Sequence, residues 1–155
     1  MNIFILDEDI EQNARYHCDQ HVVKMILESA QLLCTALNKK GFETPYRSTH
    51  MNHPCVLWTE ESYSNFRYLS ELALALNAEY RFRYETEKDH KSVTIIQQIQ
   101  SIEYADNGLT PFAQAMPDKY KVPGDAVSAY RRFYIGEKLS FATWSRRHKP
   151  EWIKP

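Results

Sequence analysis

Five polar side chains recur along one stretch of the sequence at spacings that place them on a single side of a helix. At about 100° per residue they share an arc of about 80°, and they are His17, His21, Lys24, Glu28 and Gln31. The remaining circumference is mostly apolar, whereas an ordinary surface helix has a narrow apolar stripe and a wide polar face. We therefore expect a central helix with one narrow polar side that opens onto a cleft.

The residue types on this polar side suit proton transfer and anion binding. Histidine exchanges protons near neutral pH, and a lysine beside a carboxylate serves as a nucleophile, a phosphate contact or half of an ion pair. We take Glu28, Lys24 and His21 as candidate catalytic residues, and His17 and Gln31 as candidate ligand-binding residues. The alternative is a solvent-facing stripe that is stabilised by pairs at i, i+3 and i, i+4 spacing.

A metal site is another interpretation of the same helix. His17 and His21 have the i, i+4 spacing of two metal ligands, but Asp19 falls on the opposite side and supplies no third ligand. The three cysteines have no CxxC spacing, which disfavours a cysteine zinc site and a disulfide framework. We expect no metal and no other cofactor.

A second group of polar residues precedes a proline that is well placed to begin a helix. Residues 49–54 contain two histidines and an asparagine before Pro54, and free amide groups at a helix start attract anions such as phosphate. Asn52 and His53 are therefore candidate ligand- or phosphate-binding residues. Asn52 suits the role of helix cap equally well, and Trp58, one turn later, suits the core.

The C-terminal part of the chain combines cations with aromatic rings. Residues 118–155 contain nine lysines and arginines against four acids, with aromatic side chains between them. This pattern suits phosphate contact and base stacking, and Arg131 is its candidate phosphate ligand. The alternative is that the aromatic rings anchor a terminal helix while the cations are solvated.

The composition indicates a mainly α fold in one domain, residues 1–155. Apolar residues make up 43% of the chain and glycine occurs only four times, which suits a packed helical core and disfavours a turn-rich β sandwich. We expect a compact bundle of about four helices after a short extended N-terminal segment. The helices are predicted at about 10–37, 54–80, 93–104 and 126–140, with an acidic cluster, 7–9, before the first and Asp125 as N-cap of the last.

Charge and hydropathy disfavour several classes of protein. The formal net charge of −1 provides no global field that attracts DNA, although a local basic patch is compatible with it. No apolar run approaches the roughly 18 residues of a membrane span, and the first residues lack the basic segment of a signal peptide. We expect a cytoplasmic protein with no membrane partner, and the sequence leaves its oligomeric state open.

Several of these residues together resemble a known family. Asn2-Ile3-Phe4 is followed by Asp19, Lys24, Glu28, Gln31 and Leu33, and then by Asn52-His53-Pro54 and Trp58. The set is similar to the small helical proteins called pyrimidine dimer DNA glycosylases and to their uncharacterised phage relatives. The similarity covers about the first 85 residues, and the segment 130–134 is only loosely similar.

The resemblance implies a fold of packed helices and a base-excision reaction. Strand cleavage would follow through an imine to the N-terminal amine, assisted by a glutamate on the first long helix, which by position is Glu28. Because Asn2 is bulky, Met1 is expected to remain in place, and either its amine is the nucleophile or no terminal amine is. The overall charge lacks the basic bias of the family.

The leading functional hypothesis is a DNA glycosylase-like protein that acts on a damaged or modified base flipped toward the cleft. Lys24 or the terminal amine would be the nucleophile, and His21 and His53 would bind phosphate or transfer protons. One alternative is a non-enzymatic viral protein that sequesters a nucleotide or a nucleotide-derived signal. Another is transfer of a group onto nucleotides. The partner is thus DNA or a nucleotide-type small molecule.

Overall fold

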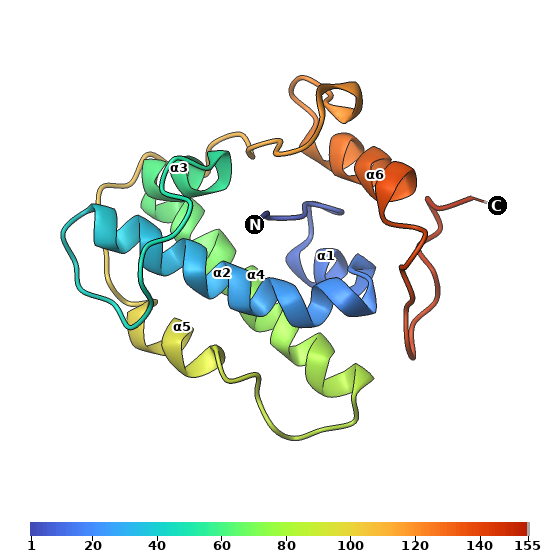
Figure 1. The fold of residues 1–155 in the computed structure, drawn as a ribbon, viewed down its shortest axis with the longest axis horizontal. Helices are drawn as coiled ribbons and strands as arrows, with labels where there is room; N and C mark the ends of the chain where they lie inside the picture. The colour runs from blue at the N-terminus through green and yellow to red at the C-terminus, as the bar shows by residue number, and fades with distance from the viewer. Residues whose placement is uncertain (155) are drawn as a thin grey trace.

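The computed structural model describes residues 1–154, and α-helices dominate its regular structure (Figure 1). The mainly α prediction is confirmed. Two of the predicted helices are divided, so the described residues contain six α-helices rather than about four. These are α1 (Ile10–Tyr16), α2 (Asp19–Lys39), α3 (Pro54–Glu61), α4 (Tyr63–Arg83), α5 (Val93–Ile99) and α6 (Ala126–Glu137), with a 3-10 turn at Asp118–Tyr120.

The predicted first helix is interrupted at His17 and Cys18, whose backbones are extended. α1 begins at the N-cap Asp9, in agreement with the acidic cluster in the sequence. α2 then starts with Asp19 in its first turn, where a carboxylate interacts favourably with the helix dipole. The prediction of one continuous helix is wrong here. His17 therefore does not share a helix with His21.

The second predicted helix is divided at Ser62. The Asp106 carboxylate accepts hydrogen bonds from the Ser62 hydroxyl (2.8 Å) and the Ser64 amide (3.0 Å). Hydrogen bonds from Ser64 and Ser62 lower the pKa of Asp106 to about 2. This carboxylate from a distant loop stabilises the start of α4, so the break depends on a tertiary contact. Pro54 occupies the first turn of α3 as predicted.

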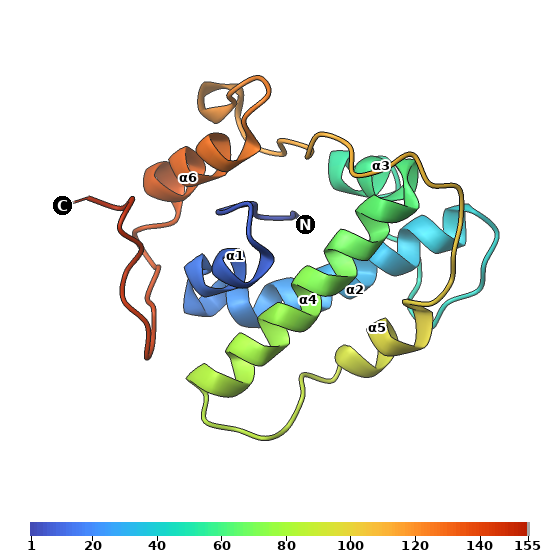
Figure 2. The ribbon, with the colours of Figure 1, turned by 180° about the vertical axis from the view of Figure 1, so that it is seen from behind.

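α2 is the central helix, as its apolar circumference predicts. It packs most extensively against α4 and α3, and its side chains Val22, Ile26 and Leu33 are fully buried. The N-terminal segment, residues 1–6, lies between α2 and α6 in both ribbon views (Figures 1 and 2). Within residues 1–154, none of the helices has the length and apolar character needed to cross a bilayer.

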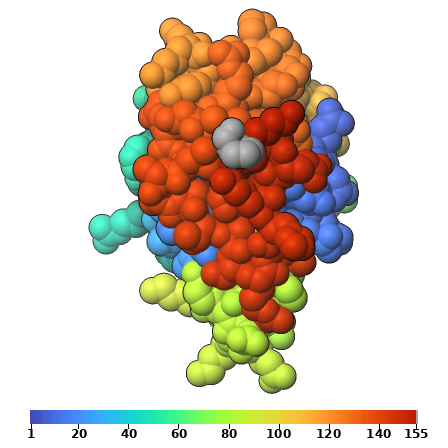
Figure 3. Space-filling model, turned by 90° about the vertical axis from the view of Figure 1, so that its right-hand side faces the viewer, coloured from blue at the N-terminus to red at the C-terminus, as the bar shows by residue number. Residues whose placement is uncertain are grey.

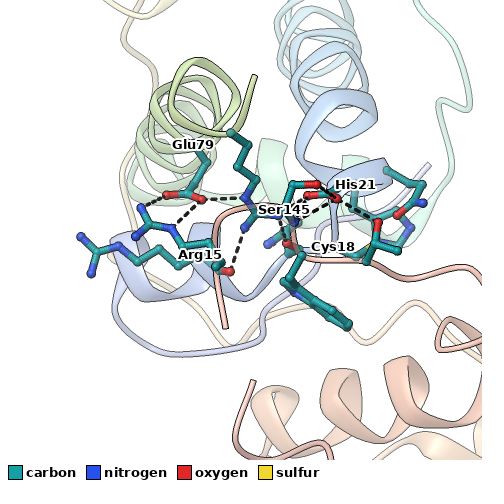
Figure 4. A network of polar contacts seen from close by, with 12 residues as sticks. Arg15, Cys18, His21, Glu79 and Ser145 are labelled. Atoms are coloured by element: carbon teal, nitrogen blue, oxygen red, sulfur yellow. Dashed lines mark hydrogen bonds and ion pairs between the residues drawn. The ribbon is translucent and has the colours of Figure 1, made fainter. Parts of the chain in front are cut away.

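A buried ionic network holds the ends of α1, α2 and α4 together (Figure 4). The Arg83 guanidinium, with a side chain 0% exposed, contacts the carboxylates of Asp19 (3.1 Å) and Glu79 (2.8 Å). It also donates to the backbone carbonyls of Arg15 (2.9 Å) and His17 (2.8 Å). Since carbonyl groups at a helix end lack partners within the helix, Arg83 satisfies the end of α1 and stabilises the break.

The C-terminal tail completes this network. The Asp19 carboxylate accepts hydrogen bonds from the Ser145 amide and hydroxyl and from the Thr143 hydroxyl. Burial raises the pKa of Asp19, but hydrogen bonds from Ser145, Thr143 and Arg83 outweigh burial and lower it overall. Figure 3 shows α6 and the tail covering this end of the molecule. The tail is therefore anchored to the core rather than a free appendage.

Arg131 links the N-terminal segment to the tail. Its guanidinium donates to the carbonyl of Leu6 (2.8 Å), pairs with Asp7 (3.2 Å) and lies over the Trp152 ring (5.3 Å). The Trp144 indole donates to the carbonyl of Tyr16 (2.9 Å). These contacts favour the anchoring interpretation of the C-terminal aromatic residues.

Replacing Arg83 is expected to destabilise the fold strongly. Arg83→Leu leaves Asp19 and Glu79 without their shared buried cation, and we expect the free energy of unfolding to fall by about 3–5 kcal/mol. The control is Arg67→Leu, which breaks an exposed pair with Glu71 and should change stability by less than about 1 kcal/mol. Urea unfolding measures both variants, and equal losses would contradict the role given to the network.

His17 is expected to make the fold sensitive to acid. Burial lowers the pKa of this 0% exposed imidazole to about 4, against about 6.5 in an unfolded chain. As the pH falls, His17 in the unfolded state therefore binds a proton at a higher pH than His17 in the folded state. The stabilisation is complete above about pH 6.5 and is lost as the pH falls toward about 4.

The variant His17→Gln removes this titration. We expect the slope of unfolding free energy against pH to decrease by up to about 1.4 kcal/mol per pH unit in that window, as measured by urea unfolding at each pH. The exposed His148 is the control, because His148→Gln should leave the slope as it is. An unchanged slope in His17→Gln would show that the proton is bound elsewhere.

Candidate functional site

The N-terminal segment lies along the polar side of α2 and runs in the direction opposite to the helix. Met1 contacts Glu28, and Phe4 stacks on His21, two turns earlier in α2, with ring centroids 4.3 Å apart. At His21 and Glu28, the side of α2 that was predicted to open onto a cleft is therefore covered by the N-terminal segment. The prediction of an open cleft is wrong, and the N-terminal segment itself forms part of the site.

The Met1 amine and the Glu28 carboxylate form an ion pair. The amine nitrogen lies 3.0 Å from Glu28 Oε1. Both carboxylate oxygens are shielded from solvent, and apart from ion pairs they accept no hydrogen bond from residues 1–154. The Met1 side chain is 3% exposed while the residue as a whole is half-buried, so its exposed part is the backbone. The exposed atoms of Met1 thus belong to its backbone, which carries the amine, whereas both carboxylate oxygens are shielded.

Asn2 holds the amine in this place. Its side-chain Oδ1 accepts a hydrogen bond from the Tyr130 hydroxyl (2.8 Å), and its Nδ2 donates to the carbonyl of Ala115 (2.8 Å). The Cys55 thiol lies 3.6 Å from the same Oδ1. Contacts from α6, α3 and the 109–117 loop therefore converge on the second residue of the chain and restrict where the amine can lie.

Lys24 is the exposed neighbour of the pair. Its Nζ lies 3.7 Å from Glu28 Oε2, and its side chain is 67% exposed. The Lys24–Glu28 pair anticipated from the i, i+4 spacing is present, but solvent screens the lysine strongly. Gln31 follows on the same side and is half-buried. Lys24 therefore offers a cation at the surface beside the amine.

His53 lies near the pair from the side of α3. It caps this helix, because its Nδ1 accepts a hydrogen bond from the Cys55 amide (3.0 Å), so the proton of the neutral ring is on Nε2. Burial and then the charges of the Met1 amine and His50 lower the pKa of His53, while Glu28 raises it. Asn52 is exposed and does not cap α3, which corrects the capping interpretation.

His21 is buried at the other end of the segment. Its Nδ1 lies 2.5 Å from the Tyr134 hydroxyl, and the residue is 5% exposed. Burial, and after it the charges of His17, Lys138 and Lys24, lower the pKa of His21 to about 3. The ring is therefore neutral at physiological pH and acts as a hydrogen-bonding group rather than as a cation.

Two predicted site residues lie apart from this group. His17 is sealed at the junction of α1 and α2, where its Nδ1 bonds to the carbonyl of Asn13 (2.7 Å). Arg131 is engaged with Leu6, Asp7 and Trp152. Both side chains form hydrogen bonds with backbone carbonyl groups and have structural roles. The structure does not bring either of them to the Met1–Glu28 pair.

Three further observations describe what surrounds the site. Among residues 1–154, no group of three His, Cys, Asp or Glu side chains is arranged to hold a metal ion. The cysteines are free and buried. Surface hollows of about 440 and 270 Å³ are lined by other segments, the first by 109–114 and 124–127 and the second by α1, α4 and Arg147.

The structure thus assembles an amine, a shielded carboxylate, a neutral histidine donor and an exposed lysine from α2, α3 and the first residue of the chain. Sequence reasoning identified Glu28, Lys24 and His53 but missed the anchors Asn2 and Tyr130. The signal for the anchors was weak. The sequence shows an asparagine beside an apolar run, but it does not show that Tyr130, more than 100 positions away, is its hydrogen-bond partner.

Comparison with known proteins adds no relative to this description. No family model matches the chain, and no curated protein or solved structure matches it either. The functional argument therefore rests on the residues and distances given above.

Proposed function

We propose that this protein is a DNA glycosylase-like enzyme that attacks the sugar of a damaged or modified nucleotide with the α-amine of Met1. The observation that carries this proposal is the 3.0 Å contact between that amine and the Glu28 carboxylate. The amine is the nucleophile and Glu28 is its proton acceptor. A DNA strand is the substrate, and the reaction uses the side chains and amine of the chain itself.

The arrangement of the pair supports these roles. A nucleophile has to reach the substrate, whereas the base that activates it has only to reach the nucleophile. The exposed part of Met1 is its backbone, while both Glu28 oxygens are shielded behind it. Lys24 lies at the surface beside the pair, where its more exposed ammonium suits contact with a phosphate better than attack on a sugar.

The chemical step balances with these groups alone. The ammonium of Met1 gives a proton to Glu28, and its lone pair forms a bond to C1′ of the deoxyribose. The bond from C1′ to the base breaks, and the base leaves with the electron pair and takes the proton that the attached nitrogen loses. Glu28 returns its proton to the ring oxygen as the sugar opens to a protonated imine. The Glu28 carboxylate then takes a C2′ proton, which expels the 3′ phosphate and cleaves the strand.

Non-enzymatic nucleotide binding is the second candidate. It is favoured by the net charge of −1, since an enzyme that tracks DNA benefits from a continuous positive surface. In that case Lys24 and His53 would hold a nucleotide phosphate, and Met1 and Glu28 would only stabilise the fold.

Borohydride trapping separates the two candidates. Reduction of the imine fixes the protein to the sugar, so we expect a covalent adduct on duplexes with an abasic site or with irradiated thymines. Mass spectrometry of the digested adduct should place the sugar on the peptide that contains Met1. Blocking the amine by a Gly-Ser extension before Met1 should abolish the adduct, because the nucleophile would then be an amide.

Lys24→Ala is the matched control for this experiment. It removes the nearest side-chain amine but leaves Met1 intact, so the adduct should still form, at higher protein concentration. An adduct lost in Lys24→Ala but kept in the blocked protein would make Lys24 the nucleophile. No adduct with any duplex, together with tight nucleotide binding that Lys24→Ala weakens, would overturn the enzymatic proposal in favour of the second candidate.

Glu28→Gln tests the role of the carboxylate. We expect the rate of adduct formation to fall by about 10² to 10⁴, because the amide accepts no proton from the amine. The Met1 ammonium also loses its partner, so the free energy of unfolding should fall by roughly 1–3 kcal/mol. Glu60→Gln is the control, since Glu60 of α3 is paired with Lys39 of α2 (2.9 Å). Wild-type rates in Glu28→Gln would exclude Glu28 as the base.

A further inference from the structure

The orientation of the His21 ring is determined on three sides by the protein. Its Nδ1 is bound to the buried Tyr134 hydroxyl, its face is stacked on Phe4, and Phe141 contacts it edge-on with centroids 5.9 Å apart. The Nε2 atom makes no hydrogen bond to residues 1–154. Unlike the sealed Nε2 of His17, it is not enclosed. One defined edge of an otherwise buried ring is therefore free.

The Tyr134 hydroxyl determines which nitrogen of His21 carries the proton. This hydroxyl has a single proton and two acceptors in reach, His21 Nδ1 at 2.5 Å and Cys18 Sγ at 3.6 Å. Sulfur is the weaker acceptor, and it is also the more distant one. Because the Tyr134 oxygen already accepts a hydrogen bond from the Cys18 amide (3.3 Å), we assign its proton to Nδ1, and the neutral imidazole then carries its own proton on the free Nε2.

Two lysines lie close enough to the His21 ring for their charges to affect it. Lys24 is one turn further along α2 and is exposed. Lys138 follows α6 as its C-cap and places its Nζ 4.8 Å from the centre of the Phe133 ring, which is itself stacked near Phe4 at 6.2 Å. An N–H donor with two cations nearby is suited to the oxygens of a phosphate, for which charge-assisted hydrogen bonds are the strong contacts.

We propose that His21 Nε2–H, with Lys24 and Lys138, binds a backbone phosphate of the DNA that flanks the sugar attacked by Met1. Tyr134 is the positioning residue that keeps the His21 proton directed outward. This inference rests on the proposed function, since it supplies the contact that aligns the strand with the amine. His21 and Glu28 are seven residues apart on α2, roughly 10 Å at the helical rise, so the contacted phosphate belongs to the strand on one side of the attacked sugar.

A set of duplexes with a stable tetrahydrofuran abasic analogue tests the phosphate contact, because this analogue binds without forming an imine. In each duplex one phosphate near the analogue is replaced by a neutral methylphosphonate. We expect one position to weaken binding of the wild-type protein about tenfold. Lys138→Ala should weaken binding to the unmodified duplex to a similar extent and should have no further effect at that position. Fluorescence anisotropy measures each dissociation constant.

Lys88→Ala is the control for charge alone, because Lys88 is exposed in the loop between α4 and α5. It should respond to the critical methylphosphonate as the wild-type protein does. If Lys138→Ala and the methylphosphonate weaken binding additively at every position, the proposed phosphate site is overturned. That outcome leaves borohydride trapping intact, whereas absence of an adduct with all duplexes refutes the proposed function instead, so the two failures are distinguishable.

The role of Tyr134 has a spectroscopic test. Ring ¹⁵N chemical shifts should show His21 as the Nε2–H tautomer in the wild-type protein and as a mixture of tautomers in Tyr134→Phe. The same variant should bind the tetrahydrofuran duplex more weakly than the wild-type protein does. If Tyr134→Phe does not fold, the wild-type spectrum still decides, because an Nδ1–H tautomer there overturns the assignment.

Discussion

A shielded carboxylate requires a cation, and Glu28 obtains its closest one from the amine of Met1, 3.0 Å away. This ion pair requires residues 1–6 to lie between α2 and α6, and contacts from other parts of the fold hold the segment there. Asn2 is held by Tyr130 and Ala115, and Leu6 is held by Arg131. The segment between them is buried. The N-terminal segment is therefore held at both of its ends rather than free to move in solvent.

The Arg83 network provides the second constraint, because it sets where α2 begins. By binding the last carbonyls of α1 and the carboxylate of Asp19, Arg83 separates two helices that the local sequence would join. The start of α2 then lies beside Tyr134 of α6, which contacts both Cys18 and His21. Arg83, at one end of the molecule, thereby influences where His21 lies in the site.

Much of the fold is predictable from the sequence because helical periodicity is a local property. The central position of α2, the cap Asp125 and the first-turn Pro54 all follow from neighbouring residues, and the structure has them there. The breaks at His17 and Ser62 are not predictable in this way. Each depends on a side chain, Arg83 or Asp106, that is distant in the sequence.

The site is predictable to a similar extent and for the same reason. Glu28 and Lys24 follow from the polar stripe, since both lie on one uninterrupted helix. The placement of His17 beside them is incorrect, because the helix is interrupted at His17 and Cys18 and its periodicity does not extend across this break. The covering of the stripe by residues 1–6 follows from no local pattern. It results from hydrogen bonds such as Asn2 to Tyr130, which join positions 128 apart in the sequence.

These long sequence separations have a consequence for the order of events during synthesis. The contacts that hold Asn2 and the start of α2 reach residues 115, 130 and 134, at separations of 113, 128 and 116 positions. Such contacts form late, because a long loop must close before they stabilise the chain. While the ribosome is still adding the first hundred residues, the amine of Met1 has no fixed place beside Glu28. The ion pair between Met1 and Glu28 is therefore expected to form only when α6 docks.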